Sequence, residues 1–106
     1  MMEKNHKEAI RKNYTFIIEN LTPESVVDSL HQEEILTMYM KEDVEVCKTR
    51  RDKVVKLLDI LVRRGPRAFD SFITALHDTE QKFVAEKLLE TVQIGQNKQL
   101  LNGMEI

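Results

Sequence analysis

The spacing of apolar residues predicts helices along most of the chain. No segment alternates apolar and polar residues as a strand does, and three glycines and two prolines leave few breaks. Apolar residues instead recur three and four positions apart, which places them on one face of an α-helix. The first such stripe predicts one long helix and consists of Ile10, Tyr14, Ile17, Ile18 and Leu21.

Capping residues divide the next stretch into two short helices. Thr22 is a candidate N-cap, and Pro23 suits the first helical position because its missing N–H would be unpaired there anyway. This second helix is expected to end near Glu34. Thr37 predicts the cap of a third helix that runs to about Val44. Its inward-facing residues are expected to be two flexible side chains, Met38 and Met40.

The second half of the chain predicts three more helices. The fourth begins around residues 48–50, and basic residues followed by Gly65 indicate its end, since glycine readily adopts a left-handed conformation there. Pro66 is expected to open the fifth helix, and Thr79 is a candidate cap for the sixth. The residues expected to face the core from these helices are Val54, Leu57, Leu58, Leu61, Phe69, Phe72, Ile73, Leu76, Val84, Leu88 and Val92.

Six short helices with short connections predict an all-α fold, a six-helix antiparallel bundle. The length of 106 residues suits a single domain. Residues 1–92 are expected to form it, because polar residues follow Gly95 and a further glycine stands at position 103. Residues 93–106 are predicted to be a polar tail or the start of a linker.

The cysteine count and the lack of long apolar runs bear on location. Cys47 is the only cysteine, so no internal disulfide is possible, which fits a reducing compartment. The N-terminal residues contain no apolar signal core, and no apolar run approaches the roughly 20 residues that span a bilayer. We therefore expect a cytoplasmic protein without membrane contact. A net charge of −2 also argues against a general nucleic-acid binder.

Charged residues are separated by sign along the sequence. Residues 22–46 contain seven acids and one base, and residues 48–67 contain eight bases and two acids, so their net charges are −6 and +6. An ordinary solvated surface is one interpretation, but interspersed signs would serve solubility better. The separation favours a domain whose acidic face docks on the basic face of a copy or a relative.

No residue pattern indicates catalysis or metal binding. Cys47 lies between Val46 and Lys48 without a glycine-framed catalytic motif, which favours an inert or packing thiol. The histidines, at positions 6, 31 and 77, lack ligand spacing. We therefore expect no catalytic site, no cofactor and no metal. The basic run from Arg63 to Arg67 could contact phosphate, but a helix end explains it equally well.

Several short motifs resemble the caspase recruitment domain (CARD) family. The run Arg64-Gly65-Pro66-Arg67-Ala68-Phe69-Asp70 is similar to the start of the fifth helix of these domains. Glu34-Ile35-Leu36-Thr37 resembles their junction between helices two and three, and Thr49-Arg50-Arg51-Asp52-Lys53 resembles the start of their fourth helix. Ile10-Arg11-Lys12-Asn13 is similar to the first helix of invertebrate initiator caspases. The resemblance covers residues 3–92 and is strongest to initiator-caspase prodomains (Dronc-like, caspase-2-like or caspase-9-like) or their adaptor.

The resemblance implies a death-fold Greek key of six antiparallel helices, the first often kinked into two halves. It also implies binding to other CARDs, with acids on helices two and three meeting bases on helices one and four. The basic face carried over by position is Arg11, Lys12, Arg50, Arg51, Lys53 and Lys56. The acidic face is Glu24, Asp28, Glu33, Glu42 and Asp43. Some family members carry a further arginine where this chain has Val55 or Tyr14, which predicts a differently centred basic face.

The function expected from this resemblance is homotypic CARD–CARD recruitment in apoptosis. The chain would act as the prodomain of an initiator procaspase, gathered by the CARD of an apoptosome-type scaffold or adaptor, with homo-oligomers through CARD–CARD contacts. The alternative within the family is an adaptor or a stand-alone regulator of caspase activation. An alternative from another class is nucleic-acid binding through the basic fourth helix.

Overall fold

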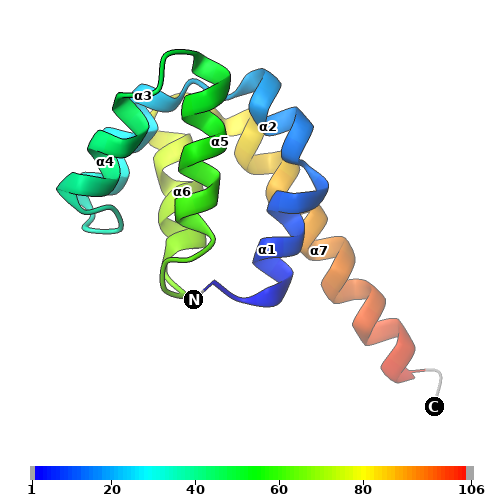
Figure 1. The fold of residues 1–106 in the computed structure, drawn as a ribbon. Helices are drawn as coiled ribbons and strands as arrows, with labels where there is room; N and C mark the ends of the chain where they lie inside the picture. The colour runs from blue at the N-terminus through cyan, green and yellow to red at the C-terminus, as the bar shows by residue number, and fades with distance from the viewer. Residues whose placement is uncertain (1, 105–106) are drawn as a thin grey trace.

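The computed structural model describes the backbone of residues 2–104 and the side chains of residues 2–95. Seven α-helices and no strand occur in this part of the chain, so the predicted all-α class is confirmed. Figure 1 shows α4 and α1 on opposite sides of α5. None of the described helices is both long and apolar enough to cross a membrane. The helices are α1 (Lys4–Lys12), α2 (Tyr14–Asn20), α3 (Pro23–Gln32), α4 (Met38–Glu45), α5 (Arg50–Leu61), α6 (Ala68–Asp78) and α7 (Lys82–Met104).

The seventh helix arises because the expected long first helix is broken at Asn13. The Asn13 side chain is buried, and its Nδ2 donates hydrogen bonds of 2.8 Å to the Ala9 carbonyl and to Thr91 Oγ1 of α7. An asparagine amide that competes for backbone groups in this way interrupts a helix. The prediction of one continuous helix is therefore wrong, whereas the two halves implied by the family resemblance are present.

The core contains most of the residues that the apolar spacing placed there. Phe69, Phe72 and Leu76 of α6 are each at most 1% exposed and lie among buried residues of the other helices. Ile73 is only partly buried. Tyr14 is wrong as a core residue, because the break at Asn13 turns the following helix and leaves its side chain 38% exposed.

Two of the three predicted threonine caps have a different role. Thr37 Oγ1 accepts a hydrogen bond from the Met40 N–H, and Thr49 Oγ1 accepts one from the Asp52 N–H, as N-caps do. The Thr22 side chain makes no capping bond at the start of α3. Thr79 ends α6 rather than starting α7, and its Oγ1 donates to the carbonyl of Ala75. Thr79 is therefore wrong as the N-cap of the last helix.

Gln81 holds the junction between α2 and α3 through two hydrogen bonds. Its buried side chain accepts a 2.7 Å hydrogen bond from the Thr22 N–H and donates a 3.1 Å bond to the Thr22 carbonyl. One glutamine side chain thereby satisfies both the N–H and the carbonyl of Thr22 at the helix start. This contact fixes the N-terminus of α7 against the start of α3.

The left-handed residues that end helices are glutamates rather than the expected Gly65. No described glycine has a positive φ, whereas Glu34 has φ 63° after α3 and Glu80 has φ 62° after α6. At the end of α3, the Ile35 N–H donates to the Leu30 carbonyl and the Glu34 N–H to the His31 carbonyl. This pairing defines a Schellman motif, and the end of α6 has the same pairing.

The segments around Gly65 and Gly95 also differ from the expected boundaries. α6 begins at Ala68, two residues after Pro66, because a turn between them precedes the helix. α7 continues through Gly95 to Met104. The domain boundary at residue 92 stays a prediction, and residues 105–106 of the expected tail lie outside the described part of the chain.

Candidate protein-interaction surfaces

A groove between α1 and α5 brings together part of the predicted basic face. On α1 its wall is formed by Lys7, Ile10 and Arg11, three and four residues apart. On α5 the neighbouring residues Val55 and Lys56 line the opposite wall. The groove has a volume of about 500 Å³, and its other lining residues are Tyr14, Cys47, Asp52, Leu58, Asp59 and Val62. Arg11 and Lys56, predicted together from sequence, therefore share one site, and Lys7 joins them unpredicted.

The other predicted bases are directed elsewhere. Lys12 lines a separate hollow between α1 and α7. Lys53 Nζ lies 3.6 Å from Glu24 Oε1 on α3, and Arg50 Nη1 donates a 2.9 Å hydrogen bond to the Leu21 carbonyl. Arg51 is exposed at the start of α5, and no hydrogen bond or ion pair involves its side chain among the described residues. The six bases thus do not form one uniform patch.

The predicted acidic face is exposed at all five positions, but two of its carboxylates already have a basic partner. Asp28 Oδ1 lies 3.2 Å from Lys41 Nζ of α4, and Glu24 pairs with Lys53 as above. Ion pairs at such exposed positions contribute about 0–1 kcal/mol to stability. Within the described residues, the predicted acids without an ion pair are Glu33, Glu42 and Asp43.

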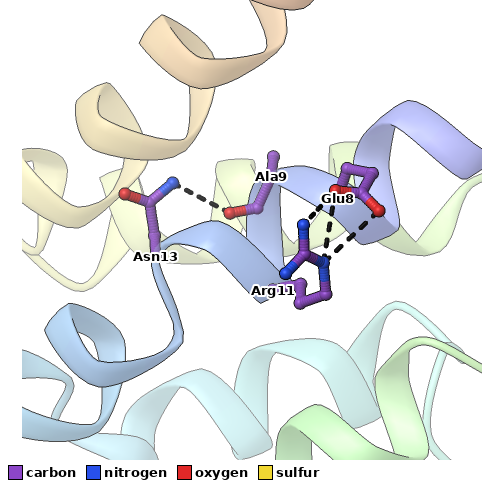
Figure 2. A network of polar contacts seen from close by, with 4 residues as sticks. All are labelled: Glu8, Ala9, Arg11 and Asn13. Atoms are coloured by element: carbon purple, nitrogen blue, oxygen red, sulfur yellow. Dashed lines mark hydrogen bonds and ion pairs between the residues drawn. The ribbon is translucent and has the colours of Figure 1, made fainter.

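Arg11 also has an intramolecular partner. Its Nη2 lies 2.7 Å from Glu8 Oε2, one turn earlier on α1, and Figure 2 shows this contact beside the Asn13–Ala9 hydrogen bond. The hydrogen bond from Arg11 lowers the pKa of the Glu8 carboxyl, and in turn raises the pKa of Arg11. Glu8 therefore stays ionised at neutral pH and partly neutralises Arg11 on the outer surface.

Exposed apolar residues on α4 and at its C-cap, Val46, were missed by the sequence interpretation. Met38, expected to fill the core, is 51% exposed, so that expectation is wrong, whereas Met40 packs against the core. Tyr39 is 80% exposed and Val46 is 76% exposed. The helical spacing contains a signal for this: Tyr39, Glu42, Asp43 and Val46 stand at i, i+3, i+4 and i+7, a stripe opposite the buried Val44.

The cysteine and the histidines form no recognisable reaction centre in the described part of the chain. Cys47 is half-buried at the end of the groove, and its Sγ donates a 3.4 Å hydrogen bond to the Asp43 carbonyl. The His6 ring stacks on Phe69, with ring centres 4.1 Å apart. No group of three or more potential metal ligands is found among the residues searched.

Comparison with known proteins gives a family for this arrangement. The family model for the caspase recruitment domain matches residues 7–91. The chain belongs to the CARD family. Caspase-2 of Gallus gallus is 31% identical over 90 residues, which are 85% of this chain and 21% of that protein. Cell death protein 3 of Caenorhabditis remanei is 30% identical over 95 residues, which are 87% of this chain and 19% of that protein.

The family match identifies this CARD as an interaction module rather than a catalytic domain. The chain spans about a fifth of the length of the two relatives. The match includes α1 from Lys7 onward, both Schellman motifs and the basic start of α5. Both charged surfaces and the groove therefore lie within the matched domain.

Proposed function

We propose that this CARD recruits an initiator procaspase to an apoptosome-type scaffold through CARD–CARD contacts. The proposal depends on the separation of charges that have no ion-pair partner within the part of the chain that the structure describes. Arg51 and Lys56 lie on α5, whereas Glu42 and Asp43 lie on α4. Such surfaces orient an encounter and exclude partners with the wrong charge pattern. Several copies gathered on one scaffold would raise the local concentration of attached protease domains and favour their dimerisation.

The relatives support a prodomain more than an adaptor. Both are named as caspases or cell-death proteins, and this chain spans only 21% and 19% of them. An adaptor or stand-alone regulator would use the same charged surfaces, so the surfaces alone do not separate the two roles. Sequencing the full reading frame distinguishes them: a protease domain on the same polypeptide supports the prodomain, and its absence supports the adaptor.

The test is binding to a panel of purified CARDs, one at a time, by isothermal titration calorimetry. At least one is expected to bind one to one. Arg51→Glu replaces attraction by repulsion at the start of α5. Because truncating a buried interfacial charge costs about 2–5 kcal/mol, the reversal should weaken binding at least about 30-fold. The matched control is Lys82→Glu, the same charge change at an exposed position of α7.

A second pair of variants identifies the face in use. Glu42→Arg reverses an exposed acid of α4, and Glu86→Lys is its control on α7. If only Arg51→Glu weakens binding, the scaffold presents an acidic surface to the basic face of this chain. If only Glu42→Arg weakens binding, the scaffold presents a basic surface to the acidic face. Binding that ignores both reversals and salt contradicts the proposal. So does failure of every CARD together with salt-dependent binding of random duplex DNA, which identifies the nucleic-acid alternative.

A further inference from the structure

Thr22 is an exposed residue whose hydroxyl the fold does not use. Its backbone N–H and carbonyl are both bonded to Gln81, but no hydrogen bond within the described part of the chain involves its Oγ1. Thr37 and Thr49, at the starts of α4 and α5, use the same group for capping bonds. The Thr22 hydroxyl can therefore be modified without the loss of a contact that holds the fold.

The residue after Thr22 indicates a class of modifying enzyme. Thr22-Pro23 is the only place in the sequence where a hydroxyl-bearing residue stands before proline. Proline favours an extended backbone for the residue before it, and Thr22 has φ −97° and ψ 108°. The hydroxyl thus stands on an extended residue just outside α3 rather than within the helix. A threonine followed by proline is the acceptor that proline-directed protein kinases select.

Two cations of α5 lie on either side of this threonine. Arg50 Nη1 donates a 2.9 Å hydrogen bond to the carbonyl of Leu21, directly before Thr22. Lys53 Nζ lies 3.6 Å from Glu24 Oε1, on the other side of Thr22. The bond from Arg50 occupies only one of the N–H donors of its guanidinium, and this group can hold a phosphate through parallel hydrogen bonds. The turn therefore already has the partners that a phosphate needs.

We propose that Thr22 is a phosphorylation site and that Arg50 and Lys53 hold the phosphate. A proline-directed kinase with MgATP supplies the group. Thr22 Oγ1 forms a bond to the γ-phosphorus of ATP, and the bond from that phosphorus to the oxygen bridging to the β-phosphate breaks. ADP leaves, and the hydroxyl proton passes to a base of the kinase. The bound phosphate adds charge-assisted hydrogen bonds between α5 and the turn before α3.

The phosphate also changes the charge of the predicted basic face. Arg50 and Lys53 belong to that face, and Arg51 stands beside them at the start of α5. A phosphate of nearly two negative charges opposes the attraction of these bases for an acidic partner. Phosphorylation thus stabilises the domain and weakens recruitment. The second effect rests on the proposed function, whereas the first does not.

The first experiment determines whether the folded chain accepts the phosphate at this residue. The wild-type chain, incubated with a purified proline-directed kinase and MgATP, should gain a single phosphate that peptide mass spectrometry places on Thr22. Thr22→Ala should remain unlabelled, and Pro23→Ala, which keeps the hydroxyl, should lose most of the labelling. Thr15→Ala, at an exposed threonine of α2, should be labelled as the wild-type chain is. An unlabelled wild-type chain, or one labelled elsewhere, overturns the proposal.

The second experiment determines which residues hold the phosphate. A chain made with phosphothreonine at position 22 should melt about 4 °C or more above the unmodified chain. This gain should vanish in Arg50→Gln and decrease in Lys53→Gln. Arg63→Gln removes the same charge beyond the other end of α5 and should keep the gain. An unchanged or lower melting temperature, or a gain that survives Arg50→Gln, contradicts the proposed phosphate site.

Binding separates this proposal from the proposed function. The phosphorylated chain should bind the CARD identified in the panel at least about tenfold more weakly than the unmodified chain does. Equal binding of the two forms overturns the regulatory effect. If no CARD binds even the unmodified chain, the proposed function fails, and a melting temperature raised through Arg50 still supports the phosphate site.

Discussion

α6 and α4 differ in what holds them in place. α6 has eleven residues and buries five of them, among them Phe69 and Phe72. α4 has eight residues and buries only Val44, so its position depends on its cap and on its contacts with α3 and α5. The outer face of α4 is therefore available for binding at little cost to stability. A family of interaction domains can vary such a face while keeping the core.

The largest effect is expected for a truncation in α6. Phe72 is fully buried, and Phe72→Ala should lower the free energy of unfolding by about 3–5 kcal/mol through lost apolar burial and a cavity. Because domains are stable by only about 5–15 kcal/mol, the variant should be largely unfolded or melt far lower. Urea denaturation followed by circular dichroism measures this. An unchanged midpoint would show that α6 is not the anchor of the core.

Loss of the cap of α4 should lower the free energy of unfolding by less than loss of a core side chain does, but by a measurable amount. Thr37 Oγ1 accepts the Met40 N–H at 3.2 Å, and Thr37→Ala removes that bond. The expected loss is about 1 kcal/mol, seen as a lower denaturation midpoint with an unchanged slope. Thr37→Ser keeps the hydroxyl and should recover most of the loss. Equal losses for both variants would mean that the hydroxyl does not hold α4.

A substitution in the turn before α4 is expected to raise stability rather than lower it. Glu34 has a left-handed backbone, which costs a side-chain-bearing residue about 1–2 kcal/mol. Glu34→Gly should relieve this and raise stability by about 0.5–1 kcal/mol, after the greater flexibility of glycine in the unfolded chain is subtracted. Glu33→Gly is the matched control, since Glu33 has φ −83° and gains no relief. If both substitutions destabilise equally, the left-handed residue carries no strain.

The smallest effect on stability is expected at the most exposed residue of α4. Tyr39→Ala should change the free energy of unfolding by no more than about 0.5 kcal/mol, as surface substitutions usually do. The same denaturation experiment measures it beside Phe72→Ala. A loss comparable to that of Phe72→Ala would mean that the outer face of α4 supports the fold, and the contrast between the two helices would be lost.

The core residues of this domain were predictable because apolar residues recur along the sequence at the spacing of one helix face. Phe69, Phe72 and Leu76 stand at helical spacing, and no distant contact changes their assignment. Tyr14 was misassigned because its place on the apolar stripe assumes one continuous helix, which Asn13 interrupts. That break depends on the hydrogen bond from Asn13 to Thr91, 78 residues later. The left-handed positions were also unpredictable, since glutamate has no preference for them.

The charged surfaces were predictable in sign but not in pairing. Separation by sign along the sequence places acids on α3 and α4 and bases on α5 without any tertiary information. Which charges are neutralised within the molecule depends on contacts between helices, such as Lys53 with Glu24 and Lys41 with Asp28. The groove was missed because it needs α1 and α5 together, and the sequence shows each stripe only separately.

The most direct measurement of the two-face account is sedimentation velocity on two charge-reversed chains, alone and mixed. Arg51→Glu reverses the charge at the start of α5 and Glu42→Arg reverses the charge on α4, so each variant alone should remain monomeric where the wild-type chain associates. The equimolar mixture should form a one-to-one complex through the two unmodified faces, and salt should weaken it. Variants that associate as the wild-type chain does, or a mixture that stays monomeric, would contradict the account.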